Sequence, residues 1–208
     1  MTGGQPLIAI VDYDVGNLKN VYTALGDVGL SGTITRDKKA LDAADAIILP
    51  GVGAFSDAMD NLRKFDLIDT LNDNVQKGKI LMGICLGMQL LFDKSYEDGE
   101  FSGLSYIPGE IIKFNAPGIK IPHMGWNNLV INRASPLVKN IGTEDYVYFV
   151  HSYYAKPDNF DDVVAYAEYS VKVPAIVKKD NVIGMQFHPE KSSNVGFQLL
   201  TNFKEMIS

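Results

Sequence analysis

Three short, continuous apolar runs in the first half of the chain constrain its fold more than any other feature. They are Leu7–Val11, Ala46–Leu49 and Ile80–Met82. A strand that is buried on both faces requires such a run, because neither of its faces meets water. Amphipathic stretches separate the runs. Strands that alternate with helices imply right-handed βαβ crossovers, so we expect a mainly parallel sheet with helices on its faces.

The stretches between the runs carry signals of helix ends. Asn17 stands at an N-cap position, and Gly29 is placed to end the helix that follows. Residues 55–77 predict a second helix. Apolar residues at helical spacing predict a last helix near the end of the chain, with a stripe formed by Leu199, Leu200, Phe203 and Met206.

From about residue 100 to 188 the pattern changes to one strand after another. The expected strands are Tyr146–Val150, Val163–Tyr169, Ala175–Val177 and Val182–Phe187. No linker or repeat interrupts the sequence, so we expect a single domain over residues 1–208. The predicted fold is a three-layer α/β fold with a mainly parallel sheet of the flavodoxin-like type and an antiparallel β extension.

The charge and the cysteine content exclude several classes of protein. The net charge is −6 and the pI is about 5.0, which leaves no basic surface for nucleic acid or an anionic membrane. The longest apolar run, Ile80–Met88, is about half as long as a membrane span. One cysteine allows no internal disulfide, and one cysteine with three histidines argues against a structural zinc site. We expect a soluble cytoplasmic protein without a metal or other cofactor.

The single cysteine, Cys85, lies between Gly83 and Gly87, after a buried run and before a predicted helix over Leu86–Phe92. This order is typical of a nucleophile elbow, in which small residues two positions away let a sharp strand-to-helix turn close. The thiol would then stand at the carboxyl edge of the sheet, where open α/β sheets bind ligands. The alternative is a small buried apolar residue, but the two flanking glycines favour a nucleophile.

A thiol nucleophile needs a base, and the chain offers three histidines. His188 ends an apolar strand, and Glu190 follows at a spacing that lets its carboxylate orient the imidazole. His123 and His151 have no carboxylate at such a spacing, so we expect neither to be catalytic. The sequence thus predicts a triad of Cys85, His188 and Glu190.

The segment Pro50–Gly53 follows the second apolar run and therefore ends at the same edge of the sheet as Cys85. Gly51 and Gly53 flank Val52, and two glycines around one residue permit unusual backbone angles and free N–H groups. Such a segment suits an oxyanion hole. A plain turn is the alternative.

Three segments together, Gly83–Gln89, His188–Glu190 and Pro50–Gly53, resemble the class I (triad) glutamine amidotransferases, in the right order and over nearly the whole chain. The resemblance implies hydrolysis of L-glutamine by Cys85, His188 and Glu190. It implies an oxyanion hole formed by backbone N–H groups of Gly51, Val52, Gly53 and Leu86.

The resemblance also implies which residues bind the amino and carboxylate groups of the substrate: Gln89, Glu97, Ser152 and Tyr153. Two of these assignments have plain alternatives. Gln89 would otherwise be a polar residue on a helix surface, and Glu97 a solvated acid in a loop.

Further segments, Ile121–Asn127, Tyr148–Tyr153 and Phe187–Ser192, resemble glutaminase subunits that supply ammonia to a separate cyclase with a (β/α)8 barrel. This chain has no phosphate-binding loop for an acceptor, which agrees with such a heterodimer. The resemblance places a docking surface at His123, Met124, Trp126, Asn127 and Lys191. The alternatives are a core position for Trp126 and a merely solvated Lys191.

One position departs from the family pattern, because Asp14 stands where we expect a small residue, often glycine. Two other functions remain possible from the residues alone. A cysteine peptidase or γ-glutamyl hydrolase would use the same elbow and base without a partner. A flavodoxin-like or receiver-type binding module would need no catalysis, but Asp12 and Asp14 would repel a flavin phosphate.

Overall fold

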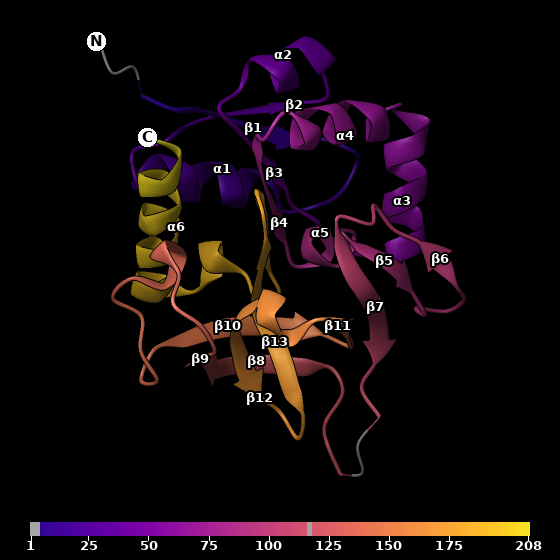
Figure 1. Ribbon diagram of the computed structural model, residues 1–208, viewed down its shortest axis with the longest axis vertical. Coiled ribbons are helices and arrows are strands. Elements are labelled where there is room, and N and C mark those ends of the chain that lie inside the picture. The colour runs from indigo at the N-terminus through magenta and orange to yellow at the C-terminus, as the bar shows by residue number, and fades with distance from the viewer. Residues whose placement is uncertain (1–4, 116–117) are drawn as a thin grey trace.

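The computed structural model describes residues 5–115 and 118–208. An eight-stranded sheet forms the centre of this part of the molecule (Figure 1). The order of its strands is β2-β1-β3-β4-β14-β13-β12-β9. Their bounds are β1 Leu7–Val11, β2 Ser31–Thr35, β3 Ala46–Leu49, β4 Ile80–Ile84, β9 Val130–Ile131, β12 Val163–Glu168, β13 Lys172–Lys179 and β14 Val182–Met185.

The first five strands of this order are parallel, and the last three are antiparallel. The parallel part has the order of a flavodoxin-like sheet, in which the second strand lies outside the first. Strand β14 comes from the far end of the chain and completes this part beside β4. The α/β fold with a mostly parallel central sheet is therefore confirmed.

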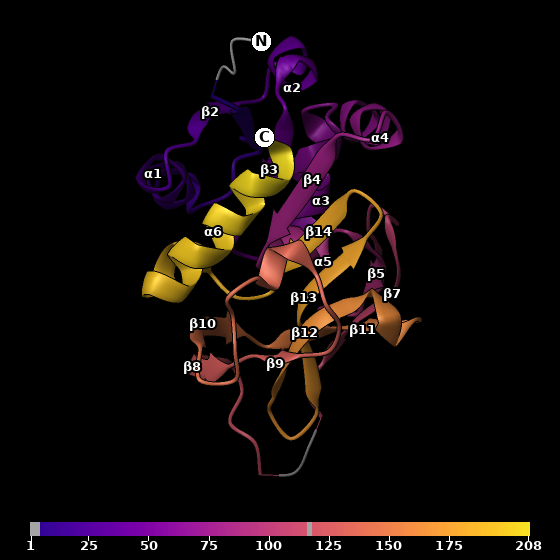
Figure 2. The same cartoon turned by 60° about the vertical axis from the view of Figure 1, so that its left-hand side comes forward.

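Helices cover the sheet on both faces, as Figure 2 shows. Helices α1 (Leu18–Asp27) and α6 (Ser193–Ile207) lie on one face, and α2 (Lys38–Ala43), α3 (Phe55–Lys64) and α4 (Ile68–Gln76) lie on the other. Alternate residues of β1 serve the two layers, because Ile8 and Ile10 pack with α1 and α6 while Ala9 and Val11 pack with α2, α3 and α4. This double burial is the physical reason for the continuous apolar runs.

Two smaller sheets accompany the main sheet: one overlaps its lower strands in Figure 1, and the other lies at its right-hand side. One pairs β8 (His123–Asn128) with β10 (Tyr146–His151). The other has the order β11-β7-β5-β6, with bounds β5 Phe92–Ser95, β6 Phe101–Ser102, β7 Ile107–Lys113 and β11 Tyr153–Pro157. The short helices are α5 Leu86–Gln89, η1 Pro136–Val138, η2 Phe160–Asp162 and η3 Pro189–Lys191.

Two expected helices differ from the structure. The helix expected over residues 55–77 is two helices, because Asp66 takes a left-handed conformation (φ 52°) and closes α3. The N–H of Leu67 donates to the carbonyl of Leu62, and the N–H of Asp66 to that of Arg63, which is the Schellman pattern. The helix expected over Leu86–Phe92 ends at Gln89, because Phe92 already begins β5. No helix in the described part of the chain is long and apolar enough to cross a membrane.

Candidate active site

Cys85 forms a strained elbow between β4 and α5. Its backbone has φ 54° and ψ −112°, a conformation that non-glycine residues rarely adopt. Both neighbouring glycines are required by close backbone approach. A Cβ on Gly83 would lie 2.4 Å from the carbonyl oxygen of Gly87, and a Cβ on Gly87 would lie 1.8 Å from that of Leu49. The backbone geometry is therefore that of the elbow predicted from the sequence.

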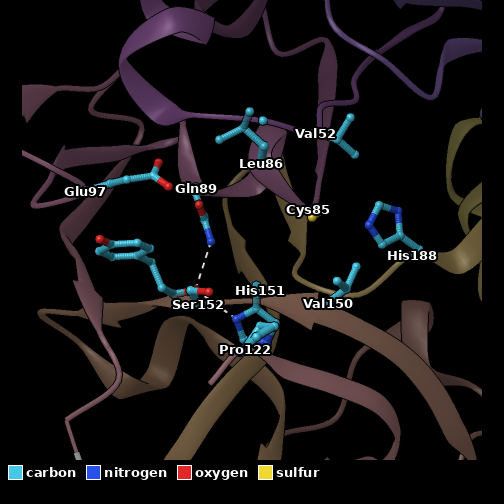
Figure 3. A pocket seen from close by; sticks show the side chains of 12 residues that line it. Val52, Cys85, Leu86, Gln89, Glu97, Pro122, Val150, His151, Ser152 and His188 are labelled. Carbon is cyan, nitrogen blue, oxygen red and sulfur yellow. Dashed lines mark hydrogen bonds between the residues drawn. The ribbon is translucent and has the colours of Figure 1, made fainter. Parts of the chain in front are cut away.

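His188 and Glu190 lie beside this elbow: His188 follows β14 and precedes η3 directly, and Glu190 lies in η3. His188 Nδ1 lies 2.7 Å from Glu190 Oε1, and the two side chains are 0% and 1% exposed. His188 Nε2 is buried, has no hydrogen-bond partner among the described residues, and its ring faces Cys85 (Figure 3). The structure thus brings the three residues of the predicted triad together.

Two opposing effects act on the protonation of this pair. Burial lowers the pKa of His188, but the nearby Cys85 and Glu190 outweigh it and raise the pKa to about 9. Burial raises the pKa of Glu190, and the contacts with His188 and Asn17 outweigh it, so that this pKa is lowered. A carboxylate and a readily protonated imidazole are the forms that a Cys-His-Glu site needs.

Sequence reasoning missed the part that Asn17 plays here. Asn17 Nδ2 donates to Glu190 Oε1 at 2.6 Å, and Asn20 Nδ2 donates to Asn17 Oδ1 at 2.9 Å. Asn17 does precede α1, as expected, but its left-handed backbone (φ 80°) turns the side chain away from the helix end and it forms no cap hydrogen bond. The signal available in the sequence was its place at the carboxyl end of β1, the same sheet edge as Cys85.

The predicted oxyanion segment is closed in this conformation. The N–H of Leu86 donates to the carbonyl of Gly51 at 3.3 Å, so this donor is already occupied. Gly53 has φ 114°, and a Cβ there would meet no atom within 4 Å. Gly51 has no positive φ; it is needed for space, because a Cβ would lie 2.6 Å from the hydroxyl of the buried Tyr13. The two glycines therefore serve different purposes.

A cavity of about 430 Å³ opens next to Cys85 and His188, and all four residues expected to bind the substrate line it: Gln89, Glu97, Ser152 and Tyr153 (Figure 3). Gln89 is buried and donates to the carbonyl of Tyr153 and to Gln186 Oε1, each at 3.0 Å. It is thus no surface residue. Glu97 Oε2 accepts from the N–H of Phe55 at the start of α3 at 2.7 Å, and burial raises the pKa of Glu97.

The residues expected on a docking surface divide into two groups. Met124 and Trp126 of β8 are 57% and 51% exposed, which excludes a core position for Trp126, and Lys191 is exposed as well. Asn127 is half-buried. His123 is only 3% exposed, so its assignment to the docking surface is wrong. Alternation along the strand explains the error, because His123 points inward while its neighbour Met124 points outward.

Asp14, the departure from the family pattern, takes a left-handed conformation (φ 60°) that aspartate tolerates better than most residues. Its carboxylate contacts Arg36 at 2.7 Å and Lys64 at 3.8 Å. These partners lie on the surface and do not include any residue of the predicted triad.

The comparison with protein families agrees with this site. The family described as glutamine amidotransferase class-I matches residues 9–206. The chain belongs to the class I glutamine amidotransferase family. This membership confirms the family predicted from the sequence and makes the chain an enzyme. It favours glutamine hydrolysis over the flavodoxin-like and receiver-type alternatives.

Curated relatives of this amidotransferase include two bacterial proteins, each named imidazole glycerol phosphate synthase subunit HisH. The one from Carboxydothermus hydrogenoformans is 50% identical over 203 residues, which are 97% of this chain and 100% of the relative. The one from Caldanaerobacter subterraneus subsp. tengcongensis is 48% identical over 201 residues, which are 97% of this chain and 98% of the relative.

Solved structures show the same fold at low identity. A crystal structure of a glutamine amidotransferase has a TM-score of 0.75 and 20% identity, and covers 96% of this chain and 97% of its own. The structure of PurLQS from Thermotoga maritima has a TM-score of 0.76 and 21% identity, and covers 99% of this chain and 100% of its own. The amidotransferase fold thus extends over nearly the whole chain.

Proposed function

We propose that this chain is the glutamine amidotransferase subunit of an imidazole glycerol phosphate synthase. It hydrolyses L-glutamine to glutamate and ammonia, and a separate cyclase subunit uses the ammonia to make imidazole glycerol phosphate and AICAR in histidine biosynthesis. The observation that carries the reaction is the strained Cys85 facing the buried His188–Glu190 pair at the wall of the 430 Å³ cavity. The names of relatives about 50% identical over nearly the whole chain support the pathway.

The first half of the reaction forms a thioester. His188 Nε2 takes the proton of the Cys85 thiol, and the sulfur bonds to the side-chain amide carbon of glutamine. When the tetrahedral oxyanion collapses, the carbon–nitrogen bond breaks. The nitrogen leaves as ammonia with the proton that His188 Nε2 returns to it.

The second half hydrolyses the γ-glutamyl thioester. His188 Nε2 takes a proton from a water molecule, the oxygen of which bonds to the thioester carbon. The carbon–sulfur bond then breaks, and the proton returns from the imidazole to the sulfur as glutamate leaves. Glu190 keeps the imidazole oriented throughout, and Asn17 holds the Glu190 carboxylate through its 2.6 Å hydrogen bond.

The oxyanion needs donors that the closed segment does not offer. Rotation of the peptide group between Gly51 and Val52 would remove the carbonyl that now accepts from Leu86, and would point the N–H of Val52 toward the reacting carbon. This rotation changes ψ of Gly51, which has no Cβ of its own to resist the change, and the adjoining Gly53 lies in open surroundings. We infer that the isolated subunit is nearly inactive and that its partner favours the rotated state.

Glutamine would bind with its reacting amide at Cys85 and its other groups along the far wall of the cavity. Glu97 is the one carboxylate that lines this cavity in the described chain, and it suits the substrate's ammonium group. Gln89, Ser152 and Tyr153 then hold the carboxylate and amino groups by hydrogen bonds.

The partner follows from the fate of ammonia, which would be protonated and lost in bulk water. Direct transfer requires an acceptor site joined to this chain, for which a (β/α)8 cyclase is the proposed partner. Met124 and Trp126 are exposed on β8, close to the cavity residue Val150 that pairs with Met124, and Lys191 stands next to Glu190. Exposed tryptophan and methionine are typical interface anchors. We place the complex in the cytoplasm.

The substitution Cys85→Ala tests the reaction. Glutamine-dependent synthesis by the complex should fall by about a thousandfold or more, whereas synthesis supplied with ammonium salts at alkaline pH should persist. An unchanged melting temperature would show that the fold is intact. Substantial residual hydrolysis by Cys85→Ala, or failure of ammonium to rescue the folded complex, would contradict the proposal.

A further inference from the structure

Two buried histidines that the reaction does not use lie opposite each other in the small sheet of β8 and β10. His123 and His151 are direct register partners across the two strands. They are 3% and 7% exposed. His151 lines the cavity, whereas His123 lies behind it, packed between the rings of Phe149 and Tyr169 at centroid distances of 4.6 and 4.0 Å.

The hydrogen bonds of these two rings have a single possible direction. His151 Nδ1 lies 2.8 Å from the carbonyl oxygen of Tyr153, which can only accept, so Nδ1 carries the proton. His151 Nε2 lies 3.0 Å from His123 Nδ1, and His123 Nε2 lies 3.3 Å from Asn127 Nδ2, which can only donate. The hydrogen bonds therefore form a row in which Asn127 donates to His123, His123 donates to His151, and His151 donates to the Tyr153 carbonyl.

This arrangement works only if both imidazoles are neutral, because a protonated ring has no acceptor nitrogen. Burial lowers the pKa of His123 to about 4 and that of His151 to about 3, which agrees with neutral rings at physiological pH. With both rings neutral, each ring nitrogen named above has a partner.

The two ends of this row of hydrogen bonds lie at functionally distinct places. The Tyr153 carbonyl at one end also accepts from Gln89 Nε2 at 3.0 Å, so two side chains of the cavity wall hold it (Figure 3). Asn127 at the other end directly follows the exposed Trp126 in β8. Strand β10 also contacts the triad, because the N–H of His188 donates to the carbonyl of Tyr148 at 3.0 Å.

We propose that His123 and His151 are positioning residues that form a one-way hydrogen-bond relay from the exposed strand β8 to the cavity wall at Tyr153. The relay fixes the turn that carries Ser152 and Tyr153, and it makes the geometry of this turn depend on how β8 is held. This inference rests on the proposed function, in which that turn binds glutamine and β8 faces the cyclase.

The tautomers test the relay without any activity measurement. The chain contains three histidines, so imidazole nitrogen NMR spectra of the full chain are readily assigned. We expect both His123 and His151 to be neutral and protonated at Nδ1. A ring that is charged or protonated at Nε2 in the wild-type protein would overturn the relay.

A matched pair of substitutions on β8 tests its direction. In Asn127→Asp the new carboxylate can only accept, so we expect the proton of His123 to appear at Nε2. Asn128→Asp makes the same change one residue away, where the amide donates to the carbonyl of Thr143 instead of a ring. It should leave both rings as they are. Unchanged rings in Asn127→Asp, or equal changes in both variants, would refute the relay.

Kinetics of the assembled complex test the positioning role. His123→Phe keeps an aromatic ring between Phe149 and Tyr169 but removes both hydrogen bonds, and we expect the KM for glutamine to rise about fivefold or more with kcat within about twofold. His123→Gln can restore a donor and an acceptor and should recover part of this loss. An inactive wild-type complex would contradict the proposed function instead. An active wild type with an unchanged KM in His123→Phe would contradict the relay alone.

Discussion

Two pairs of glycines border the reacting centre, and one of the four, Gly53, lies in different surroundings from the other three. Around Cys85, Gly83 and Gly87 are required because main-chain atoms approach within 2.4 and 1.8 Å of where their side chains would begin. Around Val52, Gly51 is also required for space, next to the hydroxyl of Tyr13, but Gly53 is surrounded by open space and Val52 is 40% exposed. The glycines around Cys85 lock their backbone segment, whereas Gly53 leaves one side of the segment around Val52 unconstrained.

This difference shows that the elbow of the site is formed in this conformation, whereas the oxyanion hole is not. The elbow is held on two sides, by the contact of Gly87 with β3 and by the hydrogen bond from the N–H of Cys85 to the carbonyl of Met185 in β14, at 2.7 Å. The oxyanion segment is held closed by the 3.3 Å hydrogen bond between Leu86 and Gly51, an interaction of about 1 kcal/mol. A partner that contributes a few kcal/mol can therefore open the segment without moving the nucleophile.

The largest effect is expected from a side chain in the locked pair. Gly87→Ala places a Cβ against the carbonyl oxygen of Leu49, which is main chain and cannot move aside. We expect a loss of about 3 kcal/mol or more in the free energy of unfolding, together with loss of glutamine hydrolysis. Denaturant unfolding followed by circular dichroism measures it. A stable and active Gly87→Ala protein would show that the elbow is not locked.

The matching change in the free segment should spare the fold. Gly53→Ala meets no atom, but its positive φ is unfavourable for alanine by about 1–2 kcal/mol. We expect unchanged glutamine binding and about a tenfold change in partner-stimulated turnover, because this cost falls on the segment that rotates. If binding and turnover changed equally, the segment would not be the switch.

Local sequence patterns predicted the locked region well. The apolar runs and the glycine spacing around Cys85 depend on neighbouring residues, so β1, β3, β4 and the elbow follow from the sequence. The end of α3 before Asp66 was missed, because it depends on the left-handed backbone of Asp66 and on the hydrogen bonds from Asp66 to Arg63 and from Leu67 to Leu62. The closed bond between Leu86 and Gly51 depends on a choice between two backbone states, which composition and spacing do not encode.

Contacts between distant parts of the chain could not be predicted from the sequence either. Asn17 and Glu190 are 173 residues apart, and only the adjacency of α1 to η3 brings the amide to the carboxylate. The burial of His123 follows from the register of β8 against β10, which pairs it with His151 and turns Met124 outward. Neither strand carries a local signal for that register.

Asn17→Ala tests the hydrogen bond that holds the Glu190 carboxylate beside the locked elbow. Loss of the 2.6 Å hydrogen bond leaves Glu190 without this donor, and we expect kcat to fall about tenfold with little change in the KM for glutamine. Asn20→Ala is the matched control, because Asn20 contacts Asn17 but not the triad, and it should lose far less. Equal losses of kcat in the two variants would show that disturbance of the loop and helix start around Asn17, and not loss of the hydrogen bond to Glu190, causes the effect.

The last expected effect is a pH dependence of stability from the two neutral imidazoles of His123 and His151 in β8 and β10. Their folded pKa values of about 4 and 3 are below the usual 6.5, so as pH falls below 6.5 the unfolded chain binds protons that the folded chain does not. Each ring therefore lowers the free energy of unfolding by up to about 1.4 kcal/mol for each pH unit below 6.5. His188 acts oppositely: its folded pKa of about 9 gives stability that is complete below pH 6.5 and is lost as pH rises toward 9.

Urea unfolding at pH 7, 6 and 5 measures this dependence. His123→Phe removes one of the two neutral rings and should make the loss toward pH 5 shallower than in the wild type. Identical profiles for the two proteins would contradict the buried neutral state of His123.

The central claim is that the nucleophile is already formed while the oxyanion site waits for the partner. The most direct test compares two rates, with and without the cyclase subunit and its ligand: alkylation of Cys85 by a small reagent, and hydrolysis of glutamine. Alkylation needs only the thiol, whereas hydrolysis also needs the rotated segment. The account predicts that hydrolysis rises about a hundredfold or more, equivalent to about 2.7 kcal/mol, while alkylation stays within about twofold. Alkylation and hydrolysis that rise together, or an isolated subunit already at full activity, would contradict it.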